Sequence, residues 1–107
     1  MSKLLSEIQS LIKAGQIKIS EHGYDELADD NIYIDDVLNS IDDADIVEEY
    51  PNYPKGKCIL LLQNDSGNKP IHTLWGVPKG NTSPAVLITS YRPDPNRWDD
   101  TFKFRKE

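Results

Sequence analysis

The sequence predicts an α+β fold in which two or three N-terminal helices pack on a four-stranded antiparallel sheet. Apolar residues recur at helical spacing over the first 42 positions, and an alternating spacing replaces it afterwards. Turn-forming residues then recur at short intervals, as they do between antiparallel strands. Helices followed by such strands are typical of the α+β class. A chain of 107 residues has the size of one domain, which we expect to span 1–107.

The helical part divides into three segments. One face of the first helix is apolar, and its members are Leu4, Leu5, Ile8, Leu11 and Ile12. Gly15 is a natural stop, and residues 17–19 alternate only briefly before Ser20 offers an N-cap for a second helix from residue 21 to 30. Apolar residues at 34, 37, 38 and 41 predict a third, short helix.

The four predicted strands cover residues 46–50, 57–63, 70–77 and 85–91. The unbroken apolar run at 59–62 predicts a central strand that is covered on both faces. Residues 64–68 form a hairpin connection in which Gly67 is expected to supply a positive φ. Residues 78–84 form a loop, and the aromatic C-terminal segment is expected to fold back onto the sheet edge or the core.

The net charge of −6 is distributed unevenly along the chain. Residues 21–50 contain twelve carboxylates and no Lys or Arg, whereas residues 51–107 contain nine basic and five acidic residues. A block of like charge is usually a solvated face, and alternatively it repels nucleic acid or attracts a basic protein partner. Since Lys and Arg bind the phosphate backbone, RNA is expected at the C-terminal half.

Several classes of protein are not indicated. No apolar run approaches the roughly 20 residues that span a bilayer, and the N-terminus has no signal-peptide pattern, so we expect a cytoplasmic protein without membrane contact. The single cysteine, Cys58, excludes an internal disulfide and is expected to be a buried apolar residue. No zinc, calcium, phosphate-loop or nucleophile-elbow motif occurs, so no metal and no cofactor are predicted.

The two histidines, His22 and His72, are the candidate acid and base of a catalytic site. Each one alone is more often structural, but two imidazoles facing an arginine can cleave RNA without metal. One imidazole takes the 2′-hydroxyl proton, the other protonates the leaving 5′-oxygen, and Arg92 stabilises the developing charge. Strand alternation places His72 opposite Ile71 and Thr73, so His22 could meet His72 if the helices pack on its side.

The segment after the last strand contains further candidates for a binding site. The predicted substrate-binding residues are Tyr91, Asp94, Trp98 and Lys79. Aromatic rings stack on bases, although a Trp near the end of a small chain more often closes the core. Arg92 either grips phosphate or forms a salt bridge with Asp94 or Asp99. Prolines at 93 and 95 restrict the backbone around Arg92.

Several short sequence blocks follow one another in a characteristic order along the chain. They are Ile19-Ser20-Glu-His22-Gly-Tyr24, Asp36-Val37-Leu38, Val47-Glu-Glu-Tyr50-Pro51, Pro70-Ile-His72, Ile88-Thr-Ser-Tyr91-Arg92-Pro93-Asp94 and Arg97-Trp98. Together they resemble the bacterial domain-of-unknown-function family 4258 over roughly residues 17–105. That family resembles, more distantly, the small RelE/ParE-like toxins of toxin–antitoxin systems.

This resemblance implies helices packed against an antiparallel sheet and an RNA-cleaving or ribosome-directed toxin. His22, His72 and Arg92 would stand at the recurring polar positions of the family. The chain departs from the family pattern at Glu26 and Asp30, where many members carry arginine, and this reverses the local potential. The alternatives are a non-catalytic protein-interaction module that uses its acidic helical face, or an anion or small-molecule site at Arg92.

Overall fold

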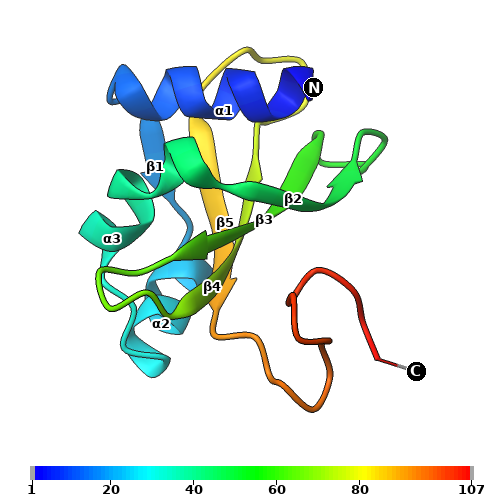
Figure 1. Cartoon of the computed structure of the whole chain (residues 1–107). Helices are drawn as coiled ribbons and strands as arrows, with labels where there is room; N and C mark the ends of the chain where they lie inside the picture. The colour runs from blue at the N-terminus through cyan, green and yellow to red at the C-terminus, as the bar shows by residue number, and fades with distance from the viewer. Residues whose placement is uncertain (1, 107) are drawn as a thin grey trace.

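The computed structural model describes residues 2–106 and confirms the α+β class (Figure 1). Its helices are α1 (Lys3–Lys13), α2 (Glu21–Asp29), α3 (Ile34–Asn39) and the short 3₁₀ helix η1 (Ile41–Asp43). Its strands are β1 (Ile17–Ile19), β2 (Asp45–Tyr50), β3 (Cys58–Asn64), β4 (Pro70–Gly76) and β5 (Ala85–Tyr91). Within the described range, no helix has both the length and the apolar character needed to cross a membrane.

The prediction of four antiparallel strands was wrong, because the sheet has five strands and is mixed. The strand order is β1-β5-β4-β3-β2, and β1 pairs in parallel with β5 while the other pairs are antiparallel. The added strand is only three residues long, so its alternation is too short to stand out as a strand. Its partner residues, Ala85 to Leu87, lie far along the chain, and only the folded structure brings them together.

Ser20 connects the second helix to the sheet and confirms its predicted role as an N-cap. Its hydroxyl accepts a hydrogen bond from the backbone N–H of Gly23 at 2.9 Å and donates one to the carbonyl of Ile88 at 2.8 Å. One side chain therefore caps α2 and fixes it against β5. The helix approaches so closely that a Cβ atom at Gly23 would lie 2.8 Å from the carbonyl oxygen of Leu87.

The hydrophobic core lies between the helices and one face of the sheet. The sheet residues of this core include Ile59, Leu61, Ile71, Trp75 and Leu87, and the helices add Leu4, Ile8, Leu27 and Val37. Gln63 is buried at the edge of this core, where its amide donates to the carbonyl of Val37 at 2.6 Å. Both faces of β3 are buried, as its apolar run predicted.

The opposite face of the sheet carries His72, Leu74 and Tyr91. A register shift between Leu74 and Trp75 lets β4 and β5 stay paired, with His72 opposite Tyr91. Residues 92–106 leave the end of β5 and fold onto this face, away from the helices, as the orange-to-red trace of Figure 1 shows.

The hairpin between β3 and β4 differs from the sequence-based expectation in one detail. The positive φ of 60° belongs to Asn68 and not to Gly67. The carboxylate of Asp65 accepts hydrogen bonds from the backbone N–H groups of Gly67 and Lys69, at 2.9 and 2.8 Å, and this fixes the turn. Asparagine tolerates the left-handed region, so the turn does not need glycine at that position.

Candidate functional site: a basic pocket

The C-terminal segment forms a small hairpin that presents basic side chains. The carbonyl of Asp94 accepts from the N–H groups of Arg97 and Trp98, which turns the chain back on itself. Trp98 then bridges Arg105 in antiparallel fashion, and the N–H of Lys106 donates to the carbonyl of Arg97 at 2.8 Å. Arg97 and Lys106 are thus neighbours across the hairpin.

Asp99 closes the tip of this hairpin. Its carboxylate accepts from the hydroxyl of Thr101 at 2.7 Å and from the backbone N–H of the same residue at 3.1 Å. The hydrogen bond from the Thr101 side chain is the largest cause that lowers the pKa of Asp99. The ionised carboxylate therefore maintains the tip at neutral pH.

Trp98 anchors the hairpin on the sheet. Its side chain is almost fully buried, and its ring stands edge-on to the imidazole of His72, with ring centroids 4.5 Å apart. The guanidinium of Arg105 lies over the indole ring, 4.8 Å from its centroid, and pairs with Glu48 on β2. Lys103 pairs with Asp45 on the same strand at 3.4 Å. The core-closing interpretation of Trp98 fits this burial.

The buried ring of His72 has a defined protonation pattern. Its Nε2 atom lies 2.7 Å from the carbonyl oxygen of Phe102, which only accepts, so Nε2 carries the proton. Burial is the main cause that lowers the pKa of His72, so the ring is neutral and Nδ1 is an acceptor. The hydroxyl of Tyr91, 3.1 Å from Nδ1, therefore donates to it. Burial also raises the pKa of Tyr91, which keeps the phenol protonated.

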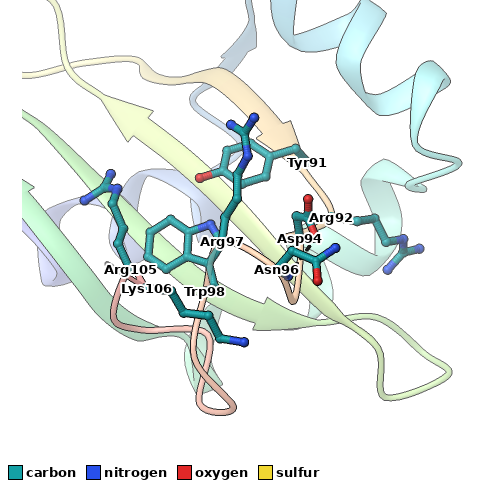
Figure 2. A pocket seen from close by; sticks show the side chains of 8 residues that line it. All are labelled: Tyr91, Arg92, Asp94, Asn96, Arg97, Trp98, Arg105 and Lys106. Carbon is teal, nitrogen blue, oxygen red and sulfur yellow. Dashed lines mark hydrogen bonds between the residues drawn. The ribbon is translucent and has the colours of Figure 1, made fainter.

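A cavity of about 680 Å³ opens between the end of β5 and the hairpin, and we call it the basic pocket (Figure 2). The pocket is lined by Tyr91, Arg92, Asp94, Asn96, Arg97, Trp98, Arg105 and Lys106. Four of these eight residues are basic and one is acidic, so the pocket reverses the sign of the charge that dominates the chain as a whole.

Two of the four basic residues are already paired. Arg92 lies 2.9 Å from the carboxylate of Asp65, and Figure 2 shows its guanidinium directed away from those of Arg97 and Arg105. Arg105 is paired with Glu48. Arg97 and Lys106 are exposed, and in the described part of the chain neither has a carboxylate within 4.0 Å. Within residues 2–106, these two are the pocket cations that remain available to an anionic ligand.

The structure brings some of the predicted site residues together. Tyr91, Asp94, Trp98 and Arg92 all line the basic pocket, although Arg92 is engaged by Asp65 and not by Asp94 or Asp99. The backbone N–H of Arg92 also donates to Asp30 at 2.8 Å. Asp30 therefore holds the backbone at the point where the chain leaves β5.

The remaining predicted residues lie outside the basic pocket. The helices pack on the face of Ile71 and Thr73, so His72 lies on the opposite face, below Tyr91 and Trp98. His22 is exposed on α2 and contacts Glu26 at 3.5 Å. No contact joins the two imidazoles in residues 2–106. Lys79 lines a separate cavity formed by the loops around residues 51–57 and 77–81.

Sequence reasoning did not select Arg97, Arg105 or Lys106. The signal was the basic character of the last eleven residues, which contain Arg97, Lys103, Arg105 and Lys106. That composition could not show which of these cations are neutralised, since Asp45 and Glu48 come from a distant strand.

Metal-ligating and thiol side chains do not form a site in residues 2–106. Over the described residues, no cluster of three or more His, Cys, Asp and Glu side chains could hold a metal ion. The thiol of Cys58 is buried, and burial raises its pKa, which disfavours the reactive thiolate.

Comparison with known proteins identifies a family. A family model described as "Domain of unknown function (DUF4258)" matches residues 19–92. No curated protein and no solved structure matches the chain. The matched range includes both histidines and ends at Arg92, so the C-terminal hairpin lies beyond it.

Proposed function

We propose that this chain, which belongs to the DUF4258 family, binds RNA by placing a phosphate of a single strand in the basic pocket. One observation carries the proposal: Arg97 and Lys106, joined by a backbone hydrogen bond across the hairpin, are both exposed and have no ion-pair partner in the described residues. Figure 2 shows their charged ends on opposite sides of a cavity that is also lined by Tyr91. Arginine and lysine supply the charge that binds phosphate, and the resemblance to RelE/ParE-like toxins implies the same ligand.

The geometry supports binding more directly than cleavage by two histidines. Both nitrogens of His72 are engaged by protein atoms, and the ring is fully buried. A proton from a bound RNA would reach His72 only through the hydroxyl of Tyr91. Acid and base roles for His22 and His72 therefore stay predictions, and they are tested separately from binding.

Binding is tested by fluorescence anisotropy with a labelled 12-nucleotide single-stranded RNA at several salt concentrations. The double variant Arg97→Gln/Lys106→Gln is compared with Lys3→Gln/Lys18→Gln, which has the same net charge. Each neutralised phosphate contributes about 0.7 to the salt slope, so the first variant, which removes the one phosphate site, should bind weakly and lose about 0.7 from the slope. The second variant should bind like the wild type. Equal affinities for the two double variants would refute the proposal.

Cleavage is tested in the same samples by separating the RNA on a denaturing gel. Intact RNA after prolonged incubation with wild-type protein would establish binding without catalysis. Cleavage that disappears in both His22→Gln and His72→Gln would establish the two-histidine mechanism, whereas cleavage that persists in both would refute it. No metal is added, because the mechanism predicted from the sequence is metal-independent.

A second candidate function is a protein-interaction module, and the exposed tyrosines of the acidic region favour it. Tyr24 and Tyr33 are 61% and 74% exposed, and their neighbours in the sequence include Asp25, Asp29 and Asp35. Exposed aromatics beside carboxylates suit a basic protein partner. Reversing these three charges should abolish recovery of a partner without loss of folding, and unchanged recovery would refute this function. Asp30 is left intact, because it binds the backbone of Arg92.

A further inference from the structure

A second, apolar hollow adjoins the basic pocket on the open face of the sheet. Its floor is formed by Cys58, Leu60, Leu74 and Ile88, which come from three adjacent strands. Cys58 and Leu60 are nearly inaccessible, so the floor is firmly packed. The volume is about 300 Å³, at the lower end of the range for small-molecule sites. We call this cavity the tyrosine hollow, because three phenols line it.

The rim of the tyrosine hollow combines aromatic rings with a few polar groups. Tyr50 and Tyr91 stand on β2 and β5, and Tyr53 follows β2 in the loop, where its side chain is half exposed. The Thr89 hydroxyl and the guanidinium of Arg105 complete the lining. An apolar floor with aromatic walls and a small number of hydrogen-bonding groups suits a flat, heteroaromatic ligand.

The tyrosine hollow and the basic pocket share two residues, Tyr91 and Arg105. Both are fixed: Tyr91 donates to His72, and Arg105 is held between Trp98 and Glu48. The wall between the cavities is therefore preorganised. A ligand that fills both must be flat and uncharged at one end and anionic at the other.

We propose that the tyrosine hollow binds one unpaired nucleobase of the RNA whose phosphate lies in the basic pocket. This inference rests on the proposed function and adds a base subsite to it. Unpaired bases are commonly recognised by stacking on aromatic side chains and by hydrogen bonds to their edges. The Thr89 and tyrosine hydroxyls are the groups that would contact those edges, and a base pair is too large for this volume.

The test compares the binding of adenosine 5′-monophosphate and ribose 5-phosphate by NMR titration. Both carry the phosphate, and only the first carries a base. Stacking on an aromatic platform should make the nucleotide bind about five- to a hundredfold more tightly to the wild type. An RNA trinucleotide should bind more tightly still, whereas equal affinity with the mononucleotide would identify a free-nucleotide site and overturn the RNA assignment.

Two variants locate the effect in the tyrosine hollow. Thr89→Trp fills the hollow and should abolish the preference for the nucleotide without changing the affinity for ribose 5-phosphate, and Thr89→Ser, which keeps the hydroxyl, is its matched control. Tyr53→Ala should reduce the preference and leave folding intact, since its ring is half exposed in a loop.

The outcomes separate the two proposals. If neither ligand binds the wild type, the basic pocket itself is not a phosphate site. If both bind equally, the phosphate site stands and the base subsite is overturned. The base subsite is also overturned if Thr89→Trp lowers the affinities for both ligands equally. It is overturned as well if Thr89→Trp leaves the preference for the nucleotide intact but changes self-association in sedimentation. That result would identify a second copy of the chain as the occupant of the tyrosine hollow.

Discussion

The hydroxyl of Tyr91 donates a hydrogen bond to Nδ1 of His72, across the directly paired positions of β4 and β5, at 3.1 Å. The same imidazole donates to the carbonyl of Phe102 and packs against Trp98. His72 therefore ties the C-terminal hairpin to the sheet and orients a phenol at the wall of both cavities. This arrangement determines how the site should respond to pH.

The free energy of unfolding should decrease as the pH is lowered, and His72 should account for part of this decrease. Burial lowers the pKa of His72 in the folded protein, so the unfolded chain takes up a proton first as the pH falls through about 6.5. Stability is therefore present above the unfolded pKa and declines below it, until the pH reaches the lowered pKa of the folded state. His72→Gln, which does not titrate, should flatten this decline.

Urea unfolding between pH 8 and pH 5 measures the effect. His22→Gln, which removes the other imidazole, is the control variant. If the free energy of unfolding depends on pH in the same way for the wild type and for His72→Gln, the prediction is contradicted.

Arg92 should matter more for stability than for binding. It pairs with Asp65 at 2.9 Å, and the two side chains are only 30% and 10% exposed. Arg92→Gln should lower the free energy of unfolding by about 1–2 kcal/mol, since a charge-assisted hydrogen bond of this kind is lost. The RNA affinity of Arg92→Gln, measured by anisotropy, should remain higher than the RNA affinity of Arg97→Gln. A double-mutant cycle with Asp65→Asn isolates the pair, and additive losses would rule out the coupling.

Gln63 should be one of the least replaceable polar residues. It donates to the carbonyl of Val37 and to the hydroxyl of Ser40, and it accepts from Thr73. Gln63→Leu has a similar size but leaves the buried carbonyl of Val37 and the buried hydroxyl of Thr73 without their partner, so we expect a loss of about 2–3 kcal/mol in chemical denaturation. Ser40→Ala removes one of these bonds and should cost less. An unchanged free energy of unfolding in Gln63→Leu would show that water replaces the hydrogen bonds of Gln63.

Gly23 should resist even the smallest substitution. Alanine normally favours a helix by about 1 kcal/mol over glycine. At this position, however, the added Cβ would lie 2.8 Å from a backbone oxygen of β5, which cannot rotate away. We expect Gly23→Ala to lower the free energy of unfolding by about 1–3 kcal/mol. Gly67→Ala, where the nearest atom is 3.4 Å away, is the control, and equal melting temperatures for both variants would contradict this reasoning.

Local patterns predicted most of the secondary structure. The Ser20 cap, the first two helices and the four longer strands depend on neighbouring residues, so spacing and capping chemistry identified them. The edge strand β1 was missed because three residues carry little periodicity and its partner lies far along the chain. The left-handed residue of the hairpin was misplaced because the side chain of Asp65 fixes that turn.

The sequence by itself determined the α+β class, the family and the concentration of positive charge near the C-terminus. Only the tertiary structure decided which face of the sheet the helices cover, and this choice buried His72 beneath Tyr91 and Trp98. It also decided that Asp65 and Glu48 neutralise two arginines, while Arg97 and Lys106 have no carboxylate partner in residues 2–106. Ion pairing and burial depend on contacts between distant segments, so local spacing and composition could not reveal them.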